Sequence, residues 1–178
     1  MAKIMKWAAV ITFLLTAAFT GVYSFGINWA LPYAITFATF FYHFAMRLLD
    51  GHILHRAMQN KANYWKAWYQ LRPFEVKLYK KLNVKKWKGA MPTYDPSCFD
   101  PKLHTWDEIA QAMCQAEIVH EVIVVLSFLP LLSAIPFGAF GVFLITSILS
   151  AMYDLSFVIM QRYNRPRILK LLSKKARV

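Results

Sequence analysis

The stretch AEIVHEVIVVLSFLP, residues 116–130, combines the apolar character of a membrane span with three ionisable side chains, Glu117, His120 and Glu121. Ionisable groups are costly in lipid and rare there, and they usually belong to a site or pair with one another. The three residues occupy positions i, i+3 and i+4, which lie on one face of a helix. The stretch therefore predicts a membrane helix with one polar face.

The composition of the whole chain fits a membrane protein. Its 178 residues are 58% hydrophobic with a formal net charge of +12, so apolar and basic residues must occupy separate regions. Four apolar stretches reach the roughly 20 residues needed to cross the hydrocarbon core of a bilayer. They are Met5–Phe25, Ile27–Leu49, Ile109–Ala134 and Pro136–Met160. The sequence predicts a single all-α membrane domain with four transmembrane helices.

The basic residues predict the orientation of these spans. All 21 Lys and Arg lie at the N-terminal end of the first stretch (Lys3 and Lys6), between Arg47 and Lys102, or from Arg162 onward. The short connections at 24–28 and 133–137 carry no charge. By the positive-inside rule, both termini, the segment 50–108 and the tail 161–178 are expected in the cytoplasm.

The segment between the second and third stretches has the pattern of a helix lying in the headgroup layer. Phe74, Leu78 and Leu82 recur every four residues, with lysines and aromatic residues around them, which favours contact with anionic membrane lipid. A segment tethered to spans at both ends meets lipid phosphates first, so no nucleic-acid partner is expected. Thr105 and Glu108 form a capping-box pattern, which predicts the start of the third span.

Polar residues of three spans are expected at one depth. At 1.5 Å per residue, Glu117 lies roughly 12 Å and Asp154 roughly 10 Å from the cytoplasmic ends of their helices. His43 and Arg47, near the end of the second span, reach a similar level. The alternative is that Glu117 pairs with Arg47 and Asp154 with His43 as bridges that only hold the helices together. We favour a shared polar cavity, which Glu121 also lines, because six polar groups exceed what packing requires.

Such a cavity suits general-base chemistry. A histidine oriented by a carboxylate can take a proton from a hydroxyl that attacks an acyl group, with His120 as the base and Glu117 as its partner. The alternative is that these two side chains, at positions i and i+3, face a third partner. Glu-x-x-His is also half of a di-iron pattern, but the chain has no second copy of it. No metal is therefore expected.

The stretch QRYNRPR, residues 161–167, places Arg162, Arg165 and Arg167 at the end of the fourth span. Pro166 is expected to break the helix, so that the guanidinium groups surround one point. Arginine binds phosphate in a bidentate manner, so the cluster predicts a site for the phosphates of a CoA donor or of a lipid. A positive-inside anchor without a ligand is an equally good interpretation.

Three motifs, LYKKLNVKKWKGAMP (78–92), AEIVH (116–120) and QRYNRPR (161–167), occur in an order and at separations that resemble the glycosyl-4,4′-diaponeurosporenoate acyltransferase family. These are small bacterial membrane proteins whose named member acylates the sugar of a carotenoid glycoside. The resemblance covers residues 74–172, and Glu121 departs from its pattern. It implies functional roles for ten residues besides Glu117 and His120: Lys85, Trp87, Lys88, Gln161, Arg162, Tyr163, Asn164, Arg165, Pro166 and Arg167.

The resemblance implies an acyltransferase of the bacterial cell membrane. The expected donor is a long-chain acyl-CoA, a co-substrate rather than a resident cofactor, and the acceptor is a hydroxyl of a glycosylated lipid such as a carotenoid glycoside. The chain has no G-x-S-x-G motif, which favours direct transfer over an acyl-enzyme. The alternative is that the protein is not an enzyme but a non-catalytic four-helix membrane protein that binds anionic lipid or assists a larger complex.

Overall fold

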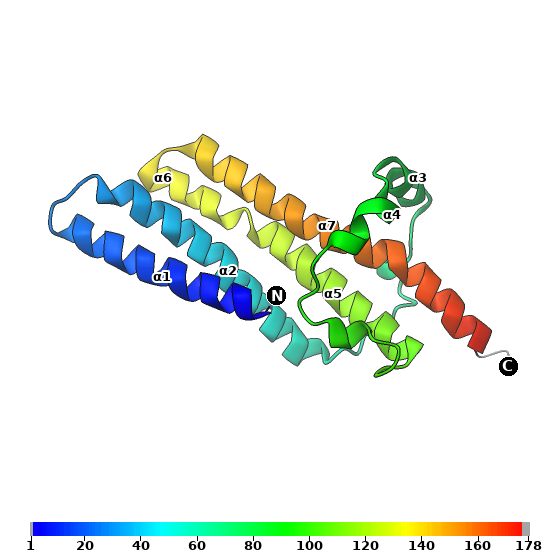
Figure 1. The fold of residues 1–178 in the computed structure, drawn as a ribbon. Coiled ribbons are helices and arrows are strands. Elements are labelled where there is room, and N and C mark those ends of the chain that lie inside the picture. Colours follow the sequence, from blue (N-terminus) through cyan, green and yellow to red (C-terminus); the bar gives the residue numbers. More distant parts are fainter. Residues whose placement is uncertain (1, 176–178) are drawn as a thin grey trace.

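The computed structural model describes residues 2–175, which form helices and no strand. Four long helices lie side by side (Figure 1): α1 (Ala2–Ser24), α2 (Ala30–Met58), α5 (Trp106–Leu126) and α7 (Phe140–Lys175). The α1–α2 and α6–α7 connections lie at one end of the bundle, and the segment between α2 and α5 lies toward the other (Figure 1). The expected all-α class is confirmed.

Short helices fill the connections between the long ones. Between α2 and α5 the chain packs beside the C-terminal half of α7 (Figure 1). The short elements are η1 (Ala67–Tyr69), α3 (Pro73–Lys81), α4 (Val84–Trp87), η2 (Lys88–Ala90), η3 (Pro96–Phe99), η4 (Leu129–Ser133) and α6 (Ala134–Phe137).

Within residues 2–175, three helical stretches are long and apolar enough to cross a membrane. They are Ala2–Ser24, Trp106–Phe137 and Phe140–Lys174. Helix α2 is long enough to cross a membrane, but its second half carries ionisable residues from His43 onward, and it is not among these stretches. A fourth crossing through α2 stays a prediction.

The long helices turn large apolar side chains outward. Trp7, Val125, Ile145 and Met152 are each more than 60% exposed. Apolar surface this extensive would be unfavourable in water, whereas lipid solvates it. Many of the buried positions are small residues, as in α2 and α5, and small residues let membrane helices approach closely.

The regular α-helix of the third span ends before the predicted end of that span. α5 ends at Leu126, and the chain continues through η4, which contains Pro130, into α6. The connection to α7 therefore lies at Gly138 and Ala139 rather than at 133–137, and both residues have positive φ. The prolyl ring cannot donate a backbone hydrogen bond, which explains why the regular helix stops before it.

The prediction that Pro166 breaks the last helix was wrong. α7 continues through Pro166 to Lys175. An interior proline costs a helix about 3 kcal/mol, but the residues beyond it have packing partners. Ile168, Leu169 and Leu172 pack against a core of Tyr64 and α5 side chains, and this tertiary packing maintains the helix.

The expected interfacial helix around Phe74–Lys88 is divided in two. α3 and α4 are separated at Asn83, which adopts a left-handed conformation with φ of 53°. The capping box at the start of α5 is confirmed, because the Thr105 hydroxyl accepts from the Glu108 N–H at 3.2 Å and the Glu108 carboxylate accepts from the Thr105 N–H at 2.8 Å.

Candidate active site

The polar groups of α2, α5 and α7 gather in two separate buried clusters. The first, which we call the Asp154 cluster, is centred on the carboxylate of Asp154, whose side chain is 1% exposed. One of its oxygens accepts from the Arg47 guanidinium of α2. The other lies 2.9 Å from Nδ1 of His120 on α5. Asp154 therefore joins three helices.

His120 is oriented on two sides. Asp154 engages Nδ1, and the imidazole stacks on Phe157 with ring centroids 4.5 Å apart. A carboxylate at Nδ1 favours the tautomer in which Nε2 carries the lone pair. Among residues 2–175, Nε2 has no hydrogen-bond partner, and the side chain is 23% exposed. His120 is thus held by its Nδ1 side with Nε2 left as an unpartnered acceptor within the described residues.

The predicted partnership between Glu117 and His120 was wrong. Asp154 takes the place of Glu117 as the group that orients the imidazole. Residues three apart on a helix are separated by about 60° around the axis, so Glu117 and His120 reach different partners. The alternative pairs were also wrong in detail, because Arg47 binds Asp154 rather than Glu117.

A chain of hydroxyls connects His43 to this cluster. Ser150 Oγ lies 3.1 Å from Nδ1 of His43 and 3.0 Å from Ser127 Oγ, and it accepts from Arg47 at 2.7 Å. Ser127 donates its own proton to the carbonyl of Ile123, so Ser150 must donate to Ser127. His43 Nδ1 is then the donor to Ser150, which leaves Nε2 as an acceptor.

Two acceptor atoms beside this cluster are buried and unpartnered within residues 2–175. They are His43 Nε2 and one carboxylate oxygen of Asp50, which lie about one turn before and one turn after Arg47 on the same side of α2. A buried polar group without a partner is unfavourable by about 1–3 kcal/mol, and such groups are common where a ligand binds. A hydroxyl-bearing ligand would satisfy both acceptors.

The second cluster, which we call the Glu117 cluster, holds the segment between α2 and α5, below called the loop segment, against α5 and α7. Glu117 is fully buried and binds Arg162 at 2.6 Å through one oxygen and Arg165 through the other. Arg162 also contacts the carboxylate of Glu75 on α3 at 2.6 and 2.9 Å. Two carboxylates therefore balance two guanidinium groups, and the cluster is closed and neutral.

Backbone carbonyls complete the Glu117 cluster. Arg162 donates to the carbonyls of Trp68 and Gln70, and Arg165 donates to that of Tyr69. Burial alone would raise the pKa of Glu75, but hydrogen bonds, first from Arg162, lower it below its ordinary value. The predicted use of Arg162 and Arg165 as phosphate ligands stays a prediction. Both side chains are buried and bind Glu117 and backbone carbonyls, and among their donors only Arg165 Nε lacks a partner within residues 2–175.

A different pair of cations remains free of carboxylates among residues 2–174. Lys88 Nζ contacts the side-chain oxygen of Asn164, and Lys88 and Arg167 lie 5.2 and 4.7 Å from the ring centroid of Tyr163. Burial, and then the charge of Arg167, lower the pKa of Lys88. We call Lys88, Asn164 and Arg167 the cationic cluster; among the described side chains no carboxylate balances its two charges.

A cavity of about 290 Å³ opens beside the cationic cluster. Asn164, Arg167 and Gln161 line it from α7, and Met113 lines it from α5. Met113 and His120 are seven residues apart and lie on one face of α5, about 10 Å apart along its axis. The cavity therefore occupies the same side of the α5–α7 pair as the histidine.

The remaining predicted residues lie outside these clusters. Lys85 is exposed, and Trp87 donates to the carbonyl of Leu82 within its own segment. Glu121 accepts from the indole N–H of Trp68 at 3.0 Å. Within residues 2–175, no three His, Cys, Asp or Glu side chains converge as a metal site, so the expected absence of a metal stays a prediction.

Comparison with known families identifies the chain. A sequence model described as glycosyl-4,4′-diaponeurosporenoate acyltransferase, CrtO, matches residues 65–174. The chain belongs to this family. Neither the curated proteins nor the solved structures that were compared gave a significant match.

The match to the CrtO family runs from η1 to the end of α7. It includes the whole Glu117 cluster, the cationic cluster and the two central residues His120 and Asp154. It excludes α1 and α2, so Arg47 and His43 complete the Asp154 cluster from outside the matched region. The resemblance first recognised in three short motifs is thereby confirmed.

Several residues of the CrtO-family site escaped sequence reasoning. Glu75 is one, although it is the only acidic residue in the basic stretch 73–88. Ser150 lies one turn before Asp154, and Ser127 lies at the end of α5, where hydroxyls are common without any function. Asp50 had the clearest signal, because it continues the face of α2 that carries His43 and Arg47.

Proposed function

We propose that this CrtO-family protein transfers a long-chain acyl group from acyl-CoA to a hydroxyl of a glycosylated lipid, with His120 as the general base. The observation that carries the proposal is the pair of His120 and Asp154, in which Nδ1 is engaged and Nε2 is open. The family membership supports acyl transfer, and this arrangement supplies the group that such a transfer requires.

The proposed step is a direct transfer. Nε2 of His120 removes the proton of the acceptor hydroxyl as its oxygen attacks the thioester carbonyl. The new C–O bond forms, the C–S bond breaks, and the imidazolium returns the proton to the departing thiolate of CoA. Asp154 stabilises the imidazolium through Nδ1, and Arg47 balances the charge of Asp154 between these events.

The unpartnered acceptors suggest where the acceptor sugar binds. His43 Nε2 and the free oxygen of Asp50 require O–H or N–H donors, which a sugar supplies and a thioester does not. Both lie on the side of α2 that faces Asp154 through Arg47. We place the sugar hydroxyls against this side of α2 as they approach His120.

The cationic cluster suits the phosphates of the donor. Lys88 and Arg167 bring two uncompensated positive charges to the edge of the 290 Å³ cavity, and charge-assisted hydrogen bonds to phosphate are among the stronger ones in proteins. In this part of the proposal Lys88 and Arg167, rather than Arg162 and Arg165, bind the phosphates. It requires the cytoplasm to be on the side of the loop segment, with both termini there and α2 as a fourth span.

The test is an assay of the purified protein in detergent with palmitoyl-CoA and an extracted carotenoid glycoside, and acylated product is measured by mass spectrometry. His120→Ala is expected to lower the rate about 10²- to 10⁴-fold, the usual effect of removing a positioned general base. The matched control is His52→Ala, because His52 lies on the exposed surface of α2. Its rate should stay within twofold of the unmodified protein.

The two substitutions separate catalysis from lipid binding. If His120→Ala retains full activity, the mechanism is wrong. If the unmodified protein binds anionic lipid but transfers no acyl group to any acceptor offered, the non-catalytic alternative replaces the proposal.

A further inference from the structure

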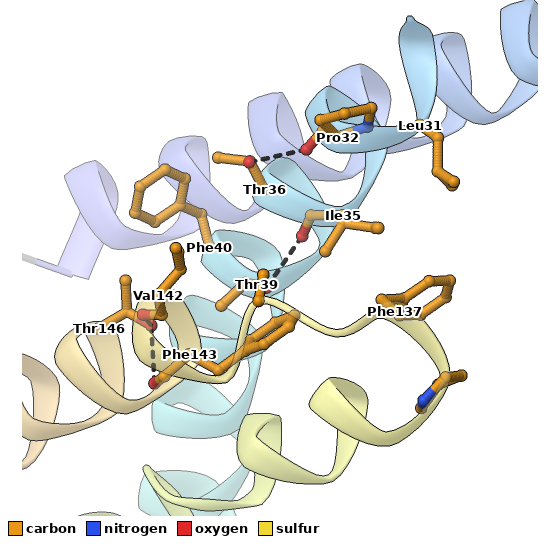
Figure 2. Close-up of a pocket in the computed structure, with 12 residues that line it drawn as sticks. Leu31, Pro32, Ile35, Thr36, Thr39, Phe40, Phe137, Val142, Phe143 and Thr146 are labelled. Carbon is orange, nitrogen blue, oxygen red and sulfur yellow. Dashed lines mark hydrogen bonds between the residues drawn. The ribbon is translucent and has the colours of Figure 1, made fainter. Parts of the chain in front are cut away.

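A second cavity, apolar and about 440 Å³ in volume, lies at the opposite end of the bundle from the cationic cluster. Figure 2 shows its lining, in which Ile35, Thr36 and Thr39 of α2 face Phe143 and Thr146 of α7. The threonine hydroxyls are used within their own helices, as in the bond from Thr36 to the carbonyl of Pro32 at 2.8 Å. The surface that lines the groove is therefore mainly apolar.

The groove exists because of how the helices pair. α1 packs closely on α2 and α5 on α7, whereas α2 and α7 approach each other mainly through long side chains. Where Arg47 and Asp154 meet, these side chains close the gap. Farther along, the facing residues are shorter or apolar and the gap stays open. A volume of this size lies in the range of small-molecule sites.

The groove and the Asp154 cluster lie on the same faces of α2 and α7, one helical turn apart. Thr39 precedes His43, and Thr146 precedes Ser150, by four residues each, which is about 6 Å along a helix. Residues four apart share a helix face. The same sides of α2 and α7 that line the groove therefore line the polar cluster one turn further toward the cytoplasmic end.

Three chemical environments follow one another along α7. Phe143 and Thr146 line the apolar groove, Asp154 orients the base about 12 Å beyond Thr146, and Asn164 begins the cationic cluster about 15 Å beyond Asp154. An acyl-CoA has its parts in this order: hydrocarbon chain, thioester, polar arm, phosphates. No other co-substrate of the proposed reaction combines an apolar tail with distant phosphates.

We infer that the groove between α2 and α7 binds the hydrocarbon chain of the acyl donor and sets the chain length that the protein accepts. The inference rests on the proposed function for the identity of the donor. Each methylene buried in such a groove strengthens binding about fourfold. Its far end, at Leu31 and Pro136, limits how many methylenes are buried.

The direct test is photo-crosslinking of the unmodified protein with palmitoyl-CoA that carries a diazirine at the end of its chain. Peptide mass spectrometry should locate the adduct on groove residues of α2 or α7, and an excess of unlabelled palmitoyl-CoA should remove it. A phospholipid with the same terminal diazirine is the comparison probe. Equal labelling by that phospholipid, or adducts only outside the groove, would overturn the inference.

The second test shortens the groove. Thr36→Phe places a ring halfway along it, and Thr20→Phe makes the same change at an exposed site of α1 that lies outside the lining. Displacing at least two methylenes should lower the ratio of kcat/KM for palmitoyl-CoA to that for octanoyl-CoA by about tenfold or more. Thr20→Phe should leave this ratio unchanged, and an unchanged ratio in Thr36→Phe contradicts the inference.

The two tests separate this inference from the proposed function. Cross-linking in the groove without any turnover upholds the groove as an acyl-chain site and refutes the catalytic proposal. Turnover with cross-links only outside the groove supports the catalytic proposal and refutes the groove as the acyl-chain site. A Thr36→Phe protein that changes its preference among acceptor lipids, but not among donors, would assign the groove to the acceptor and overturn the inference.

Discussion

The roles of the two central carboxylates can be separated by Glu117→Gln. In the structure Glu117 is fully buried and binds two guanidinium groups. Arg162 keeps Glu75 when the charge of Glu117 is removed, whereas Arg165, which is 1% exposed, keeps only the carbonyl and ring of Tyr69. The substitution therefore leaves one buried charge without a counterion.

The expected effect is on stability rather than on chemistry. Removing one partner of a buried ion pair destabilises a protein by about 3–5 kcal/mol, and we expect the lower end, because only Arg165 loses its counterion. The free energy of unfolding is measured by SDS titration in detergent micelles. The rate per folded molecule should stay within about threefold, because Glu117 contacts neither His120 nor the open Nε2.

Two further variants serve as controls for this prediction. Glu121→Gln is the matched control on the same helix, since its amide oxygen can still accept from Trp68, and it should destabilise by less than about 1 kcal/mol. Glu117→Met combined with Arg165→Met removes both charges and should recover most of the lost stability. If Glu117→Gln is fully stable, or if it folds normally and loses activity a hundredfold, the assignment of Glu117 to structure is wrong.

Four other outcomes are expected. Asp154→Asn should lower kcat about 10²-fold or more, because an amide no longer favours the required imidazole tautomer or stabilises the imidazolium; kcat within threefold of normal contradicts this role. Arg167→Ala should raise the KM for acyl-CoA about tenfold with little change in kcat, as steady-state kinetics would measure, and an unchanged KM removes the cationic cluster from donor binding. The pKa of Glu75 is lowered from its ordinary value of 4.5, so ionised Glu75 stabilises docking of the loop segment fully at pH values above 4.5. This stabilisation is lost as the pH falls toward the lowered pKa. Limited proteolysis of the loop segment should therefore accelerate in acid, and Glu75→Gln should abolish this pH dependence. In a variant without native cysteines, an impermeant reagent should label Ser24→Cys but not Ser173→Cys from outside the cell, and the reverse pattern would invert the topology.

Hydrophobic length and spacing predicted much of this fold. Apolar runs located the long helices, and the pair Thr105 and Glu108 located the start of α5, because both signals are local. The sequence did not predict that α7 continues through Pro166, since the packing of Leu169 and its neighbours depends on chain that is distant in sequence. Propensity alone favours a break at such a proline.

The sequence predicted which residues form the candidate site better than it predicted which side chains bind one another. His120, Asp154, Arg47 and His43 do meet, as expected from their common depth. The partner of each was not predictable, because it depends on the rotation and register of α5 against α7. Glu117 shares a helix face with His120 in the pattern, yet a turn of about 60° sends it to a different cluster.

The pairing of charges between α5 and α7 has a consequence for how the protein enters the membrane. α5 carries Glu117, and α7 carries the arginines that neutralise it. Inserted alone, α5 would expose the charge of Glu117 within the membrane without a counterion, which is unfavourable. The connection at Gly138 and Ala139 is short enough for the two helices to remain together. We therefore expect the two helices to insert together as a hairpin whose ion pairs form early, and we expect a long insertion at Gly138 to impair biogenesis while leaving every residue of the candidate site intact.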